Sequence, residues 1–446
     1  MATGLGGAAR DGRGLMRRLY SWLTALLAPV VWLRLHWRAL KEPLYRKAIG
    51  ERFGFYRSPR TTGWLWVHAV SLGETRAAAS LIDALRQIDP SLRVLLTHGT
   101  ATGRAAGEEL VHPGDRQVWL PWDSAGATRR FFARHRPCLG VLMETEVWPN
   151  LLHAAQAAGV TMVLANARLS ERSRRRGERL GLMIRQAAES ITLVLAQTEA
   201  DALRLRSAGA RQVEVCGNLK FDMTPAPELL AQGRRWRDAV KRTVVLATST
   251  REGEEAELLA AWTAQPVPRP LLLIVPRHPQ RFNEVARLVE AAGLGLARRS
   301  VWADQPPPSA LESDVWLGDS MGELPLYYAL AQVALLGGSF APLGGQNLIE
   351  AAACGCPVLM GPHTFNFAQA AELALEAGAA RRVQTLREAV ALACELTSPV
   401  QRREQIARCL AFAAQHRGAA QRMAQRIAAM LHPAHPAEAG APKADA

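Results

Sequence analysis

The strongest constraint on the fold of this chain is an alternation of short apolar runs with helical patterns, which begins near Trp64. Seven such steps come first, with the runs WLWVHAV, RVLLTHG, QVWLPW, CLGVLMETE, TMVLANAR, LVLAQT and QVEVCG. Strands that alternate with helices in this way indicate βαβ units and a parallel sheet. The first half of the chain is therefore predicted to be a doubly wound α/β domain.

A second series of the same kind follows a break in the pattern. The segment GNLKFDMTPAPELL contains Asn, Asp and two prolines and is predicted to be a linker. Beyond it come TVVLATST, PLLLIVPRHP, DVWLGDS, VALLGGSF and CPVLMGP. Because 446 residues are too many for one ordinary core, we predict two Rossmann-like domains, at residues 41–225 and 226–430, with a disordered tail at 431–446.

The first 40 residues have the composition of a membrane-interface segment. The apolar stretch Leu19–Leu33 is flanked by arginines and contains Trp22 and Trp32. It is shorter than the roughly 20 residues that a spanning helix needs, and Pro29 would kink it. Tryptophan beside arginine is typical of the membrane interface. We predict an N-terminal membrane-anchor helix within residues 1–40, either spanning the bilayer or lying on it, with a buried globular helix as the alternative.

The net charge narrows the class of partner, and the cysteine content indicates the compartment. The formal net charge of +14 favours an anionic partner, which is nucleic acid, a membrane surface or a phosphorylated substrate. No RNA-binding string or aromatic stacking platform is recognisable, so nucleic acid is not expected. The six cysteines have no CxxC pair and no zinc spacing, which fits a reduced cytoplasmic compartment.

Carboxylates follow two strands of the first series. In HAVSLGETRAA, Ser71 and Glu74 have the spacing of a capping box at a helix start. Glu74 also follows the carboxyl end of a strand, where ligands of open α/β sheets bind, so it is a candidate general base as well, although this stretch alone favours the cap. In METEVW, Glu144 and Glu146 alternate at another strand end; strand register slightly favours Glu144 as the residue that faces the site.

Polar groups also follow the strands of the second series, and each set suits part of a nucleotide. They comprise hydroxyls, an arginine that can grip phosphate bidentately, a helix start that favours an anion, and a glycine turn followed by a carboxylate that can accept ribose hydroxyls. A nucleotide-binding half that faces a half carrying Glu74 is the architecture of GT-B glycosyltransferases, with the active site in the cleft between them. The candidate donor-binding residues are Ser249, Thr250, Arg277, His278, Asp319, Gly322, Glu323, Gly344, Gly345, Asn347 and Glu350.

From about Leu19 to about Arg382 the chain resembles the bacterial 3-deoxy-D-manno-octulosonic acid (Kdo) transferases of lipopolysaccharide synthesis. The resemblance lies in HAVSLGE, METEVWPNLL, NARLSERS, AQTEADA, GNLKFD, STREGEE, PRHPQRF, LGDSMGELPLYYALA, GGSFAPLGGQNLIEAA and GPHTFNFA, in the family order. It implies a CMP-Kdo donor, a lipid A precursor (lipid IVA) as acceptor, and inversion without a metal or other cofactor. It also implies the cytoplasmic side of the inner membrane of a Gram-negative bacterium.

The resemblance also assigns roles to residues. It implies that Glu74 is the base, with Glu144 beside it, and that Met321 joins the donor contacts. It implies acceptor contacts from Ser71, Gly73, Arg76, Arg168 and Arg172. The arginine-rich run near Arg172 is expected to dock acceptor and membrane, with a solvated basic helix face as the alternative.

One departure from the family pattern lies in the glycine turn. Gln346 stands where the family usually has His, and Ile349 where it has Pro, whereas Asn347 and Glu350 are retained. Gln346 keeps hydrogen-bonding capacity but carries no charge. Two rivals stay open, another GT-B enzyme such as a UDP-sugar transferase or epimerase, and a basic membrane- or nucleic-acid-binding protein without catalysis. The number of Kdo residues transferred is also open.

Overall fold

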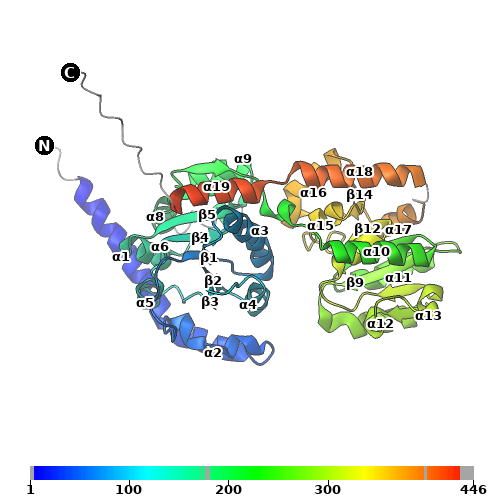
Figure 1. Cartoon of the computed structure of the whole chain (residues 1–446), viewed down its shortest axis with the longest axis horizontal. Helices are drawn as coiled ribbons and strands as arrows, with labels where there is room; N and C mark the ends of the chain where they lie inside the picture. The colour runs from blue at the N-terminus through cyan, green and yellow to red at the C-terminus, as the bar shows by residue number, and fades with distance from the viewer. Residues whose placement is uncertain (1–4, 172, 176–180, 396–398, 432–446) are drawn as a thin grey trace, which may run out of the picture. The chain divides into compact units, whose positions relative to one another are not determined.

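The computed structural model describes residues 5–171, 173–175, 181–395 and 399–431. The chain divides into two compact units, one made of Met1–Asp222 with Arg417–Ala446 and the other of Met223–His416. Each unit contains a seven-stranded sheet in which all pairs are parallel (Figure 1). The fold class predicted from the alternating pattern is confirmed.

The first sheet has the order β3-β2-β1-β4-β5-β6-β7. The chain starts at the centre with β1, moves outward to β3, and then returns to the other side of β1 with β4. The strand order therefore reverses between β1 and β4, which is the switch point where open α/β sheets bind ligands. The strands are β1 (Leu65–His68), β2 (Val94–His98), β3 (Arg116–Trp119), β4 (Leu139–Met143), β5 (Thr161–Ala167), β6 (Leu193–Ala196) and β7 (Val213–Val215).

The second sheet repeats this plan, with the order β10-β11-β9-β8-β12-β13-β14 and a switch point between β8 and β12. Its edge strands, β10 and β14, were not predicted from the sequence. The strands are β8 (Val244–Thr250), β9 (Leu271–Pro276), β10 (Leu296–Arg298), β11 (Val315–Leu317), β12 (Val333–Leu336), β13 (Val358–Met360) and β14 (Ala380–Arg382).

Helices cover both faces of each sheet, because the strands are apolar on both sides. In β1, Leu65 and Val67 pack into one buried cluster, whereas Trp66 points to the other face and packs against Phe131. The helices of the first unit are α1 (Leu5–Leu26), α2 (Ala28–Arg38), α3 (Leu72–Ile88), α4 (Ala101–Glu108), α5 (Ala125–His135), α6 (Pro149–Ala157), α8 (Gly181–Glu189), α9 (Glu199–Ser207) and α19 (Ala419–Leu431), with the 3₁₀ turns η1 (Pro43–Arg46), η2 (Ile49–Phe53) and η3 (Leu219–Asp222).

The helices of the second unit precede, separate and follow its strands in chain order. They are α10 (Pro227–Val240), α11 (Glu254–Thr263), α12 (Phe282–Ala291), α13 (Pro308–Glu312), α14 (Leu324–Leu330), α15 (Leu348–Ala353), α16 (Ala368–Glu376), α17 (Leu386–Glu395) and α18 (Pro399–Gln415), with η4 (Pro279–Arg281), η5 (Arg299–Val301) and η6 (Phe365–Phe367).

The predicted end of the second domain at residue 430 is corrected by the last helix. Met423 and Ile427 of α19 are fully buried in the core of the first unit, and α19 lies alongside α3 (Figure 1). Asp222 fixes the start of this helix, because its carboxylate accepts hydrogen bonds from the backbone amides of Gly418 and Ala420. The second unit therefore ends at His416; the tail predicted after it, apart from Leu431, lies outside the described residues.

The N-terminal helices belong to the first unit and are not a separate domain. The break between α1 and α2 lies next to Pro29, which is in the first turn of α2. Helix α1 is held by polar contacts: the Tyr20 hydroxyl donates to Asp123 at 2.9 Å and the Ser21 hydroxyl donates to Asn150 at 2.7 Å. None of the helices in the described part of the chain is both long enough and apolar enough to span a membrane.

Candidate active site

Glu74 lies at the switch point of the first sheet, in the first turn of α3. Its carboxylate accepts hydrogen bonds from the Val70 amide at 2.8 Å and from the Ser71 hydroxyl at 2.9 Å, while Ser71 caps the helix by accepting from the Glu74 amide. Burial raises the pKa of Glu74, and the charge of Glu144 raises it further. Both oxygens thus take part in the cap, and each keeps a second lone pair for a ligand.

Glu144 follows β4 on the other side of the switch point. Its backbone adopts a left-handed conformation, with φ of 58°, which is uncommon for a residue other than glycine and is found at functional sites. This turn interrupts the two-residue alternation of the strand, so strand register does not decide which of Glu144 and Glu146 faces the site. Burial and the charges of Glu74 and Glu144 raise the pKa of Glu146 to about 7, while Trp148 donates to its carboxylate.

Lys220 completes this cluster and was missed from the sequence, where its segment GNLKFD was interpreted as a linker. Its ammonium lies 3.3 Å from the Glu144 carboxylate, and its charge lowers the pKa of Glu74. The signal for Lys220 was its place after the last strand of the first series, because the carboxyl ends of parallel strands share one edge. We refer to Glu74, Glu144, Glu146 and Lys220 as the carboxylate cluster.

Asn166 fixes the turn that carries Lys220. It is the penultimate residue of β5, has a left-handed φ of 52°, is completely buried, and accepts a hydrogen bond from the Leu219 amide at 3.0 Å. Its own carbonyl accepts from the Gln197 side chain at 2.9 Å. Asn tolerates this backbone conformation better than most residues. A buried side chain next to β4 therefore sets the position of the ammonium group opposite Glu144.

The other acceptor residues expected from the resemblance lie on the same unit. Gly73 and Arg76 are exposed in the first turns of α3, and the Arg168 amide donates to the Glu144 carbonyl at 3.4 Å, which places Arg168 beside the cluster. Arg172 lies outside the described residues. Of the same arginine-rich run, Arg174 and Arg175 pair with Glu171 on the helix surface.

In the second unit, the hydroxyls expected to bind the donor lie at the end of β8. Ser249 is buried with a left-handed φ of 53°, and a Cβ at Gly337 would come within 2.4 Å of its carbonyl oxygen, so the loop after β12 touches the end of β8. Thr250 is also buried, but its hydroxyl donates to Glu255 at 2.7 Å. Thr250 therefore supports the loop through Glu255.

Arg277 and His278 follow β9 and are exposed. The Arg277 amide donates to the Thr250 carbonyl at 3.0 Å, which brings this loop next to the one after β8. The pKa of His278 is lowered by burial first and then by the charges of Arg251, Arg277 and Arg281. Cations thus gather beside the second switch point, as a site for phosphate requires.

Asp319 and Glu323, expected at a helix start that favours an anion, are both engaged in ion pairs. The Asp319 carboxylate accepts from Arg298 and from Ser300, each at 2.7 Å, and the Glu323 carboxylate accepts from Arg299 at 2.7 Å. Both acids therefore hold the η5 turn. Between them, Met321 is exposed and Gly322 has a φ of 82° with open space around it, so this tip remains accessible to a ligand.

The glycine turn after β12 folds back on itself, since the Gly345 amide donates to the Gly338 carbonyl at 2.8 Å. Gly344 and Gly345 have positive φ, and a Cβ at Gly344 would clash with Asn366 at 2.5 Å. Asn347 caps α15 by accepting from the Ile349 amide at 3.1 Å, so its oxygen is not directed at a ligand in the way the sequence suggested.

Glu350 is partly buried on α15. Its charge is one cause of the raised pKa of Tyr328, whose hydroxyl lies 3.1 Å from that of Thr248 on β8. Glu350 therefore lies at the second switch point, near the end of the central strand. Within the described residues, no group of three or more His, Cys, Asp or Glu is arranged to hold a metal ion.

Comparison with a solved structure defines the class of protein. A glycosyltransferase from Rickettsia africae matches with a TM-score of 0.56 at 11% identity, over 84% of this chain and 100% of that chain. Two parallel α/β units with polar clusters at their switch points are thus a GT-B fold.

Sequence comparison gives the family. The chain is 48% identical to the 3-deoxy-D-manno-octulosonic acid transferase of Bordetella pertussis over 422 residues, 91% of this chain and 97% of that protein. It is 33% identical to that of Haemophilus influenzae over 420 residues, 92% and 97% of the two. The family model described as 3-Deoxy-D-manno-octulosonic-acid transferase (kdotransferase) matches residues 47–223. The chain belongs to this family of glycosyltransferases, which act in lipopolysaccharide synthesis.

Proposed function

We propose that this protein transfers Kdo from CMP-Kdo to a glucosamine hydroxyl of a lipid A precursor, lipid IVA, with inversion and without a metal. The observation that carries the proposal is the carboxylate cluster: three carboxylates and one ammonium group gather where loops from β1, β4 and η3 meet. Such a cluster suits removal of a proton from an attacking hydroxyl. The rival classes, a UDP-sugar enzyme and a binding protein without catalysis, do not account for the carboxylate cluster in a member of this family.

Glu74 is the proposed base. The acceptor hydroxyl oxygen forms a bond to the anomeric carbon of Kdo, its proton passes to Glu74, and the bond from that carbon to the CMP phosphate breaks. Burial and Glu144 raise the pKa of Glu74, which brings it toward the working pH and makes proton transfer more favourable. Lys220 limits this rise, which favours the ionised form of Glu74.

CMP leaves with negative charge on its phosphate, and the second unit supplies the compensating charge. Arg251 and Arg277 act on His278 electrostatically at the end of β9, as does Arg281, whose guanidinium also pairs with Glu255 at 2.6 Å and Glu284 at 2.8 Å. Fixed cations aimed at the leaving phosphate stabilise the charge as it develops. They offer the stabilisation that a bound metal ion gives in other transferases, so the proposed mechanism uses none.

The test of the proposed function is a product assay. Purified protein is incubated with CMP-Kdo and lipid IVA, and the lipid products are analysed by mass spectrometry. Addition of one or more Kdo residues, at a rate unchanged by a metal chelator, is the expected result. Transfer from UDP-sugars with none from CMP-Kdo would overturn the donor assignment, and loss of the reaction with chelator would overturn metal independence.

The proposed location is the cytoplasmic surface of the inner membrane, and it rests on the orientation of α1. This helix turns its polar side chains toward the protein, since Tyr20 and Ser21 bond to Asp123 and Asn150. Its apolar side chains face outward; Trp22 is 76% exposed and Leu26 is 77% exposed. Such an inverted amphipathic helix is stable where its outer face meets lipid.

Changing Trp22 and Leu26 to serine is expected to reduce vesicle binding by roughly tenfold or more, because each buried apolar side chain contributes about 1.5–3 kcal/mol. Activity should fall on lipid IVA in vesicles and persist on detergent-dispersed lipid IVA. Cosedimentation and the ratio of the two activities are the measurements. The matched control changes Val301 and Leu410, exposed residues of the second unit; equal losses in both variants would contradict docking through α1.

Asn166 is expected to affect turnover through Lys220. Asn166→Gly keeps the left-handed backbone accessible but removes the acceptor for the Leu219 amide, so turnover should fall while the Michaelis constant for CMP-Kdo changes little. Asn166→Asp keeps an acceptor oxygen and should retain more turnover. In a Lys220→Met background, Asn166→Gly should add little further loss, as expected for residues that act as a unit. Fully additive effects would mean that Asn166 acts independently of Lys220.

A further inference from the structure

A second cavity of the first unit plays no part in the proposed reaction. It has a volume of about 810 Å³, which is in the range of small-ligand sites, and lies between the segment from Arg46 to Arg60 and helix α5. Five arginines line it, namely Arg46, Arg57, Arg60, Arg130 and Arg134. No residue of the cavity belongs to the carboxylate cluster, so it is a separate feature of the unit.

The charge of this cavity is not balanced from within. Among its lining residues, Glu51 is the one acid, and its carboxylate is already bonded to the Trp119 amide at 2.8 Å and to Arg104 at 3.4 Å. Burial first, and then repulsion from Arg134, lower the pKa of Arg116, whose guanidinium bonds to the Pro59 carbonyl of the same segment. An anion in the cavity would relieve this repulsion.

The walls of the cavity hold some of these guanidinium groups in place. Arg130 donates to the Phe53 carbonyl at 2.6 Å and lies over the Phe55 ring at 4.6 Å, and Arg134 donates to the Tyr56 carbonyl at 2.5 Å. Since backbone carbonyls neutralise no charge, both groups keep their full positive charge. Preorganised guanidinium groups are well suited to phosphate.

Ser58 provides an independent indication of a ligand. It lines the cavity, and its hydroxyl oxygen is buried without a hydrogen-bond partner among the residues that the structure describes. Buried hydroxyls are normally hydrogen-bonded, because an unpaired one costs free energy. A ligand oxygen in the cavity would satisfy it.

The surroundings of the cavity indicate that the ligand is part of a lipid. Phe55 at its rim is 63% exposed, and the chain reaches Arg46 directly from the outward apolar residues Trp37 and Leu40, each 68% exposed. The Arg38 guanidinium lies 5.1 Å from the Tyr45 ring, which links the end of α2 to η1 beside the cavity. Apolar side chains next to arginines are typical of surfaces that contact acyl chains and headgroups together.

We propose that this arginine-lined cavity binds the phosphate of an anionic phospholipid headgroup. The proposal rests on membrane docking by α1 and α2, and it adds selectivity for anionic lipid to the apolar contact. Phosphate oxygens would accept from the guanidinium groups and from the Ser58 hydroxyl, while the acyl chains extend along the exposed apolar residues.

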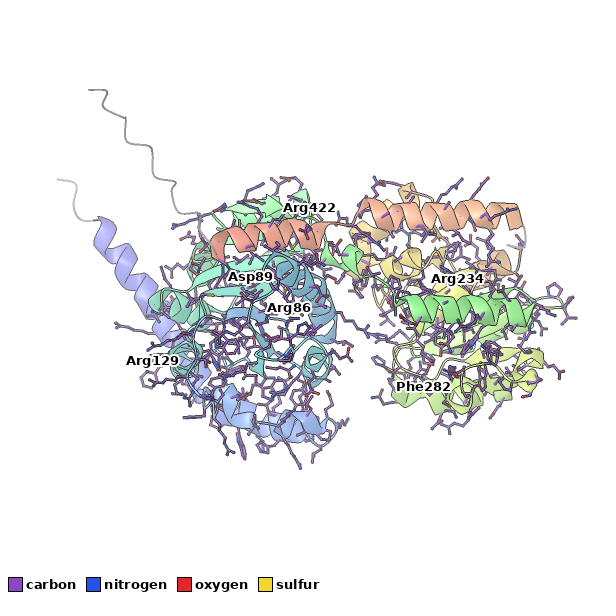
Figure 2. The ribbon with its side chains drawn as sticks, viewed as in Figure 1. Arg86, Asp89, Arg129, Arg234, Phe282 and Arg422 are labelled. Carbon is purple, nitrogen blue, oxygen red and sulfur yellow. The ribbon has the colours of Figure 1, made fainter. Side chains whose placement is uncertain are left out.

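The test compares vesicles of phosphatidylcholine alone with vesicles that also contain phosphatidylglycerol. Arg57→Gln with Arg60→Gln should lower affinity for the anionic vesicles by roughly 30-fold, since each arginine near an anionic surface contributes a factor of about five. Affinity for neutral vesicles should be unchanged. The matched control is Arg234→Gln with Arg235→Gln on α10 of the second unit (Figure 2), which removes the same charge and should lose less than threefold.

Ser58→Ala separates a built site from general charge attraction, because it leaves the net charge unaltered. It should lower affinity for anionic vesicles by about tenfold, the effect of losing a hydrogen bond to a charged group, without lowering the melting temperature. Equal losses in the cavity and control arginine pairs, or no effect of Ser58→Ala, would overturn the proposal. If inorganic phosphate binds in the cavity but does not reduce vesicle binding, the site would be reassigned to a soluble ligand.

The Trp22 and Leu26 variant tests docking through α1 separately from the headgroup site. If the Trp22 and Leu26 variant binds vesicles normally, docking through α1 fails, whatever the arginine variants do. If that variant fails to bind neutral vesicles while the arginine variants bind them normally but lose selectivity for phosphatidylglycerol, both proposals stand. Loss of binding to both kinds of vesicle in the arginine variants would contradict a headgroup site.

Discussion

Replacing Glu74 by glutamine is expected to lower the turnover of Kdo transfer by about 10²- to 10⁴-fold, the usual cost of losing a general base. CMP-Kdo binding should be nearly unchanged, because the donor-binding residues that we propose lie in the second unit. The fold should also persist, since the amide oxygen of glutamine can still accept from Val70 and its NH₂ group can donate to Ser71. Turnover at saturating donor, donor binding by calorimetry and the melting temperature are the measurements.

Ser71→Ala is the matched control for this prediction. It removes the helix cap, which costs about 1 kcal/mol, and leaves the Glu74 carboxylate and its bond to Val70 in place. It should therefore lower the melting temperature while keeping turnover within roughly tenfold of the parent, far less than the loss of a base. If both variants instead share a lowered melting temperature and near-normal turnover, Glu74 serves only as half of a capping box.

Glu74 takes part in the helix cap and also lies at the ligand-binding edge of the sheet, and the sequence predicts only part of this arrangement. The spacing of Ser71 and Glu74 predicted a capping box, and the strand before them predicted a place at the ligand edge; the structure contains both features. The sequence does not show that the Glu74 carboxylate itself accepts hydrogen bonds from Val70 and Ser71. Which donor a carboxylate oxygen accepts from depends on side-chain torsions, and spacing along a helix does not determine those.

The strands were predictable to the extent that they are buried. All seven runs of the first series and all five of the second became strands, because two-sided burial requires apolar residues. The edge strands Leu296–Arg298 and Ala380–Arg382 were missed, since each is three residues long and partly exposed. An edge strand needs only backbone pairing with its neighbour, which leaves little trace in composition.

Long-range partners account for the remaining errors. Asp319 and Glu323 follow a strand and precede a helix, as ligand-binding acids do, but Arg298 and Arg299 reach them from an edge strand that was not predicted. Helix α19 reads as the natural end of the second series, and only its packing on α3 places it in the first unit. Lys220 was missed for a similar reason, because its partner Glu144 is distant in the sequence.

Lys220→Met is expected to lower turnover by about 10²-fold, the typical cost of removing one electrostatic contact from an active site. The ammonium group is 3.3 Å from Glu144. Without it, Glu74, Glu144 and Glu146 would repel one another with no nearby cation of the cluster to offset them. Loss of the ammonium group should also shift the pH dependence of kcat/KM in a defined direction.

Lys220 lowers the pKa of Glu74, whereas burial and Glu144 raise it. Removing the ammonium group therefore raises this pKa, so a higher pH is needed to ionise the base. The acidic limb of the profile of kcat/KM against pH should move to higher pH in Lys220→Met and stay in place in Lys220→Arg, which keeps the charge. The charge of Lys220 is not among the causes that raise the pKa of Glu146 to about 7. An acidic limb near pH 7 that does not move in Lys220→Met would thus identify Glu146, and not Glu74, as the group that accepts the proton.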